Sequence, residues 1–155
     1  MRPVGVCLRI NSSHGDPFQA ITSLDNAAPN VTAFFDKTTS TISYVVADME
    51  ARVCAIIDPV LELEESSAEI TTLGAETILE YLRANQLSCE YILETQAHAY
   101  HLSAGYFFTQ RTGAPIGIGQ LIVDVQHVFT EKYSEPPRFK RDGAQFDLLL
   151  KDGQK

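Results

Sequence analysis

Two histidines that lie three residues apart, His98 and His101, are the residues of this chain best suited by type and spacing to do chemistry. Imidazole nitrogens bind first-row metal ions, and two of them on one short loop can coordinate an ion weakly. Lasting occupancy usually needs three or four ligands. The pair is therefore either a remnant of a metal site or two polar side chains that are hydrogen-bonded within a loop.

Asp58 is a third candidate, because it ends the apolar run of residues 53–58. A carboxylate at the end of a buried strand can stand behind a metal-binding histidine and orient its ring. The same carboxylate can instead cap the backbone of the turn at Pro59. The sequence leaves both roles open.

The elements around these residues follow from hydrophobic patterning. Residues 31–36 and 42–48 are rich in β-formers, and residues 53–58 and 89–95 are apolar runs typical of strands covered on both faces. Apolar residues at helical spacing predict an amphipathic helix over 73–84. Further expectations are a solvated loop over 62–72, helices over 102–111 and 121–129, and strands over 115–118 and 146–150. Strands that alternate with helices predict an α/β fold.

The length of 155 residues suits one ordinary domain. Residues 1–30 show no clean periodicity, so we expect an irregular leader there and a domain over 31–155. The cysteines Cys7, Cys54 and Cys89 have no paired spacing, which favours reduced thiols in an intracellular protein. Arg2 and Arg9 in the leader leave the mitochondrion open beside the cytoplasm.

Charge and hydropathy exclude two classes of partner. The formal net charge of −8 and the pI of about 4.9 argue against nucleic acid, which needs a basic surface. No apolar run approaches the roughly 18 residues that cross a bilayer, so we expect no membrane segment.

Residues 93–104, which read LETQAHAYHLSA, resemble the T-H-x-H-x-D-H signature of the metallo-β-lactamase superfamily. Gln96 stands in the place of the first histidine of this signature, and Tyr100 stands in the place of its aspartate. Residues 34–36, 44–48, 55–60 and 114–119 are similar to the persulfide (sulfur) dioxygenase branch of that superfamily. The glyoxalase II branch is the alternative.

The resemblance implies chemistry with Fe(II) or Zn(II). In the persulfide dioxygenase branch, Fe(II) is held by two histidines and one carboxylate, and glutathione persulfide is oxidised to sulfite. In the glyoxalase II branch, a metal-dependent thioester hydrolysis would be expected. The first iron ligand falls on Gln96, the only imidazole after His101 is His127, and the later aspartate would fall beyond residue 155. We therefore expect that catalysis is impaired or lost, and that the chain either binds Fe(II) or Zn(II) or binds no metal at all.

The resemblance also implies the N-terminal half of an αββα sandwich. A single sheet with helices on one face would leave its other face apolar and open. Such a chain is a fragment, a half-domain that pairs with another copy, or a compact half-domain with a rearranged sheet. The alternative to an enzyme is thus a non-catalytic interaction module that self-associates.

Overall fold

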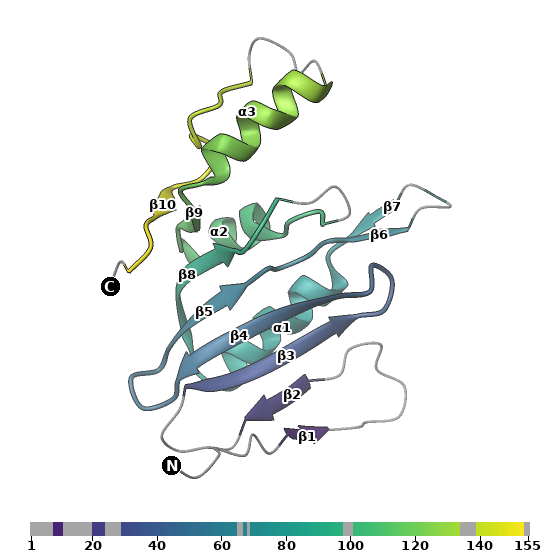
Figure 1. The fold of residues 1–155 in the computed structure, drawn as a ribbon. Coiled ribbons are helices and arrows are strands. Elements are labelled where there is room, and N and C mark those ends of the chain that lie inside the picture. The colour runs from purple at the N-terminus through teal and green to yellow at the C-terminus, as the bar shows by residue number, and fades with distance from the viewer. Residues whose placement is uncertain are drawn as a thin grey trace.

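The computed structural model describes residues 8–10, 20–23, 29–64, 67, 69–97, 101–133 and 139–153. Figure 1 shows one broad sheet, with helices α1 and α2 behind its central strands and helix α3 beyond one end. These helices span Leu73–Ala84 (α1), Gly105–Thr112 (α2) and Ile122–Tyr133 (α3).

In the part of the chain that the structure describes, eight strands form this sheet in the order β1-β2-β3-β4-β5-β8-β9-β10. Their bounds are Leu8–Ile10 (β1), Ala20–Ser23 (β2), Asn30–Asp36 (β3), Thr41–Asp48 (β4), Val53–Ile57 (β5), Ser88–Glu94 (β8), Ile116–Gly119 (β9) and Leu148–Leu150 (β10). Strands β1 to β5 pair antiparallel, whereas β5, β8, β9 and β10 pair parallel. Since a helix lies between each consecutive pair of parallel strands, the predicted α/β class is confirmed.

The core lies between the sheet and helices α1 and α2. Each of the strands β3, β4, β5 and β8 contributes one almost fully buried side chain to this core: Phe34, Val45, Ile56 and Ile92. Phe108 of α2 is also buried there. The ring of Phe34 also packs edge-on against Tyr81 of α1, with centroids 5.4 Å apart. Burial of side chains of this size contributes about 1.5–3 kcal/mol each, so the residues that formed the apolar runs of the sequence hold α1 and α2 on the sheet.

Cys54 and Cys89 are buried, unbridged and paired in register between β5 and β8. They therefore behave as the small core residues that their apolar surroundings predict. Cys7 lies outside the described residues.

Residues 62–72 differ from the expected solvated loop. Strands β6 (Glu62–Glu64) and β7 (Glu69–Thr71) pair antiparallel there as a separate hairpin. The side chain of Glu62 is buried, and its Oε1 and Oε2 accept hydrogen bonds from the N–H groups of Gly74 (2.5 Å) and Leu73 (3.1 Å). The hairpin thus supplies the cap for the first turn of α1, which the Thr72 side chain does not provide.

Part of the expected irregular leader is regular. Residues 8–10 and 20–23 form β1 and β2, and β2 pairs antiparallel with β3 at the edge of the sheet. The expectation of an irregular segment was wrong at these positions, because very short edge strands leave no periodicity to detect. The rest of residues 1–30, apart from positions 29 and 30, lies outside the described residues.

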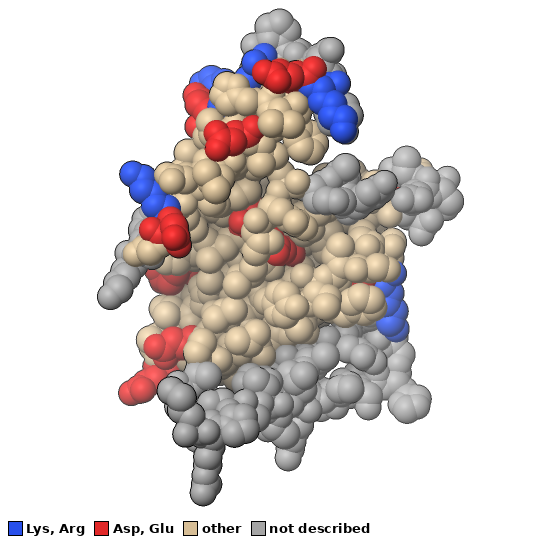
Figure 2. Space-filling model, in the orientation of Figure 1, with Lys and Arg blue, Asp and Glu red and all other residues tan. Residues whose placement is uncertain are grey.

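The sheet face opposite α1 and α2 is apolar and is covered by no helix among the described residues. Phe35, Ile42, Tyr44 and Tyr91 are 36–48% exposed on it. Figure 2 shows this face toward the viewer, with uncharged side chains over most of the strands and Lys and Arg at the margins. We call the surface formed by Phe35, Ile42, Tyr44 and Tyr91 the open face. Helices long and apolar enough to cross a bilayer do not occur in the described ranges.

The Glu62 cap gives a test of the fold. Glu62→Ala should lower the free energy of unfolding by about 1–3 kcal/mol, because it leaves the first N–H groups of α1 without an acceptor in a buried place. The matched control is Glu69→Ala, which removes an exposed carboxylate from the other strand of the same hairpin. Urea unfolding followed by circular dichroism measures both, and equal losses would show that Glu62 does not cap the helix.

Candidate metal centre

The candidate site lies where two parallel strands end together. Strands β5 and β8 pair parallel up to Ile57 and Leu93, with one register shift after Cys54, and the N–H of Asp58 donates to the carbonyl of Leu93 at 2.8 Å. The next residues on both strands therefore meet at one edge of the sheet. Such carboxyl ends of parallel strands are where α/β folds commonly carry their sites.

Asp58 fixes the start of the loop that carries the histidines. Its two carboxylate oxygens accept hydrogen bonds from the N–H of Thr95 (2.7 Å) and from the hydroxyl of Thr95 (2.6 Å). Asp58 itself has a φ of 48°, a left-handed conformation that aspartate and asparagine tolerate better than most residues. The structure thus places Asp58 as the cap of the Thr95 turn, not of the turn at Pro59.

The end of the loop returns to the same place. The N–H of Leu61 donates to the carbonyl of Leu102 (2.7 Å), and the N–H of Ala104 donates to the carbonyl of Pro59 (2.8 Å). An isolated bridge between Val60 and Ser103 lies between these two bonds. Because both ends of the loop are bonded to one short segment after β5, His101 is brought back beside Asp58.

Glu94, the last residue of β8, points into the protein beneath this loop. Its Oε1 accepts a hydrogen bond from the hydroxyl of Ser103, whose oxygen in turn accepts the N–H of Gly105 at 2.8 Å. Gly105 is closely packed there, since a Cβ on it would lie 3.0 Å from Ser103 Oγ and 3.4 Å from Glu94 Oε1. The first turn of α2 is therefore built directly on the Glu94 carboxylate.

His101 lies against the other oxygen of the same carboxylate. Its Nε2 is 3.3 Å from Glu94 Oε2, and the two side chains are only 13% and 4% exposed. The Glu94 carboxylate raises the pKa of His101 above its usual value; burial opposes this shift, and Asp58 and the Pro59 backbone support it. Neither atom makes a hydrogen bond within the described part of the chain, and the contact is an ion pair when His101 is protonated.

Donor atoms of Asp58, Glu94 and His101 all lie within 4.8 Å of one another. Two carboxylates and an imidazole form a donor set that suits a first-row divalent metal. The unpartnered, buried Oε2 and Nε2 atoms agree with a cation at this place. His101 is the one member of this set that also stands at a signature position; Gln96, at another, is exposed, and a carboxamide is a weak neutral ligand.

The structure thus brings together two of the residues singled out from the sequence, Asp58 and His101. His98 and Tyr100 lie outside the described residues, and His127 is exposed on α3. Glu94 was missed. The signal was present, because a carboxylate two residues after the core residue Ile92 of a buried strand must point inward too, and an inward carboxylate needs a partner.

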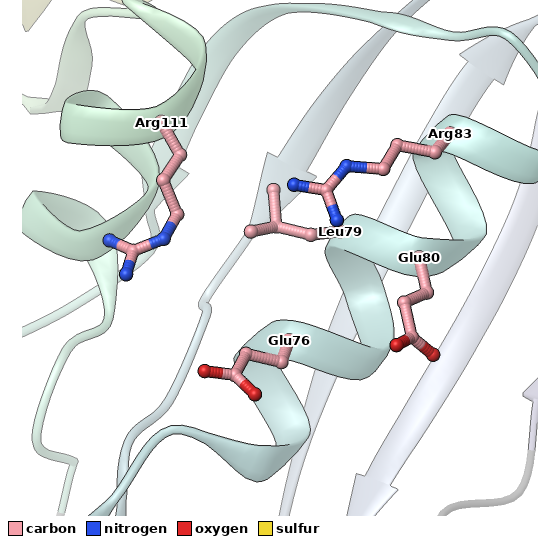
Figure 3. Close-up of a pocket in the computed structure, with 5 residues that line it drawn as sticks. All are labelled: Glu76, Leu79, Glu80, Arg83 and Arg111. Carbon is pink, nitrogen blue, oxygen red and sulfur yellow. The ribbon is translucent and has the colours of Figure 1, made fainter.

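A surface pocket of about 180 Å³ lies between α1 and α2, away from the Asp58 cluster. It is lined by Glu76, Leu79, Glu80, Arg83 and Arg111. Figure 3 shows acidic and basic side chains from the two helices around Leu79. All four charged residues are exposed, and two acids balance two bases. This pocket is a solvated charge cluster and offers no group for chemistry.

No family model matches the chain. Among curated proteins, it is 42% identical over 148 residues to a beta-lactamase hydrolase-like protein of Xylella fastidiosa. This match covers 93% of this chain and 34% of the relative. It is 40% identical to a Burkholderia pseudomallei protein named "Probable metallo-hydrolase" (79% of this chain, 42% of the relative). It is 32% identical to the Dictyostelium discoideum protein named Glyoxylase B2 (81% and 43%).

The chain therefore spans between about a third and under half of the length of these relatives. Among solved structures, the BLEG-1 B3 metallo-beta-lactamase matches 79% of this chain and 53% of its own, with a TM-score of 0.49 and 18% identity.

The Asp58 contacts generate a test of the loop. Asp58→Ala should lower the free energy of unfolding by about 1–3 kcal/mol, because it removes two hydrogen bonds and places alanine at a left-handed position. Asp58→Asn is the matched control, since its amide can still accept the Thr95 N–H and tolerates this φ. Thermal or urea unfolding compares the two, and an Asn variant as unstable as the Ala variant would contradict the capping role.

Proposed function

Because this chain belongs to the metallo-β-lactamase superfamily, we propose that it is a hydrolase-like member of the persulfide dioxygenase branch whose metal-dependent turnover is impaired. The observation that carries the proposal is Gln96, an exposed carboxamide at the position of the first metal-binding imidazole. The blocks around Asp58 and residues 114–119 support the choice of branch. Glutathione persulfide is then the expected substrate, and a glutathione thioester is the substrate of the glyoxalase II alternative.

A bound metal in such a site would polarise the substrate and activate oxygen or water. The residues of this chain provide the scaffold for that chemistry: Asp58 fixes the loop, and the 59–61 and 102–104 segments close it. What the loop lacks is donor strength at Gln96, since a neutral amide oxygen binds Fe(II) or Zn(II) far more weakly than imidazole. Impaired turnover follows from that loss of affinity.

Activity assays test this function directly. We expect the Fe(II)-treated, tag-free protein to show no oxygen uptake with glutathione persulfide above a protein-free control, and the Zn(II)-treated protein to show no hydrolysis of a glutathione thioester. Sustained turnover of either substrate would contradict the proposal that metal-dependent catalysis is impaired. The substrate that is turned over would then assign the branch.

Restoring the signature tests the cause of the impairment. Gln96→His combined with Tyr100→Asp should raise the affinity for Zn²⁺ by about tenfold or more, because it adds an imidazole and a carboxylate to the loop. The control is Gln110→His with Tyr106→Asp, which makes the same two changes, also four residues apart, on the exposed surface of α2. Competition with a chelating dye measures both, and an equal gain in the control would show that the loop lacks the geometry of the family.

The open face favours self-association as a second function. Phe35, Ile42, Tyr44 and Tyr91 present an apolar surface that a second copy could bury. We expect a concentration-dependent dimer in analytical ultracentrifugation, and we expect Tyr44→Glu with Tyr91→Glu to convert it to monomer. Tyr106→Glu, at a tyrosine that is 72% exposed on α2, is the control. A wild-type monomer at all concentrations would exclude this function.

A further inference from the structure

The Glu94–His101 contact brings two buried groups together that need a positive charge between them. Glu94 Oε2 and His101 Nε2 are both buried and lack hydrogen-bond partners in the described ranges, yet they lie 3.3 Å apart. A carboxylate oxygen and an unprotonated ring nitrogen both present lone pairs, and a buried unpaired carboxylate is costly. A positive charge must therefore lie between them, as either a proton or a metal ion.

The contact itself fits both cations. A proton on His101 Nε2 would make it an ion pair, although no hydrogen bond joins the two atoms. Two ligand atoms on one tetrahedral zinc, with bonds of 2.0–2.2 Å, lie about 3.4 Å apart. The observed 3.3 Å agrees with that separation.

Asp58 supplies a third donor. It belongs to the same cluster within 4.8 Å, and its carboxylate is held in place by the two hydrogen bonds from Thr95. A carboxylate offers about four lone-pair directions, so these two bonds leave it able to bind a cation as well. Two carboxylates and one neutral imidazole would balance the double charge of the ion.

We propose that Asp58, Glu94 and His101 form a binding site for one first-row divalent metal ion such as Zn²⁺. Of the signature positions this site uses only His101, and it takes its other two ligands, Asp58 and Glu94, from the ends of β5 and β8, so it is compatible with the replacement of signature ligands by Gln96 and Tyr100. It does not depend on the proposed reaction, since an ion held here can be structural and bind whether or not any substrate is turned over.

Metal binding by the tag-free, chelator-stripped protein tests the site. Equilibrium dialysis against Zn²⁺ should give about one ion per chain, and Co²⁺ should give the visible absorption bands of a protein-bound ion. Glu94→Gln should weaken Zn²⁺ binding by about tenfold or more, because it replaces a charged ligand by a neutral amide. His101→Gln should weaken it to a similar extent.

Two controls define the location. Glu90→Gln makes the same change at an exposed position of the same strand, and Gln96→Ala alters the signature position; both should keep the wild-type affinity. Circular dichroism confirms folding, and if Glu94→Gln does not fold, Glu94→Asp, which shortens the side chain by one methylene, takes its place with the same expected loss.

The proposal is overturned if the wild-type protein binds no Zn²⁺ at micromolar concentrations. It is also overturned if Glu94→Gln and His101→Gln retain wild-type affinity. Binding that is abolished by Gln96→Ala or His98→Ala but not by the Glu94 variant would place the ion on the signature loop and would contradict the site. Turnover of persulfide or thioester does not enter these outcomes, so failure of the proposed function is recognised separately.

Discussion

The parallel pairing of β5 with β8 is the constraint on which the rest of the candidate site depends. It brings Asp58 and Thr95 to one edge of the sheet, where two hydrogen bonds of 2.7 and 2.6 Å join them. The segment that follows His101 bonds to Pro59 and Leu61, with Leu61 N–H on the Leu102 carbonyl and Ala104 N–H on the Pro59 carbonyl. These backbone bonds bring His101 beside Asp58.

A buried carboxylate organises the space beneath this loop. Glu94 joins three elements, since it ends β8, accepts the Ser103 hydroxyl at the start of α2 and faces His101. Charges in such surroundings are retained only where they are paired. The proposed loss of metal chemistry concerns Gln96, whereas the proposed cation at Glu94 concerns a different set of donor atoms, so the two proposals are independent of each other.

Much of the fold could be predicted because its central elements have clean periodicity. Alternation in β3 and β4, the apolar runs of β5 and β8 and the amphipathic pattern of α1 all matched the structure within one or two residues. Glu62 could not be placed because local patterning reads an acidic residue as solvated, and Glu94 was missed for the same reason although its alternation with Ile92 points it inward. Only tertiary contacts, the first turn of α1 for Glu62 and the start of α2 for Glu94, make their burial favourable. The partners that set the site are distant in sequence, which periodicity does not register.

The central claim is that a divalent cation, and not a proton, lies between Glu94 and His101. An anomalous difference map at the zinc absorption edge, from crystals grown with Zn²⁺, tests it most directly. The account predicts one strong peak within bonding distance of Glu94 Oε2 and His101 Nε2, with Asp58 in reach. A peak confined to the loop surface near Gln96, or no peak and a direct hydrogen bond between Glu94 and His101, would contradict it.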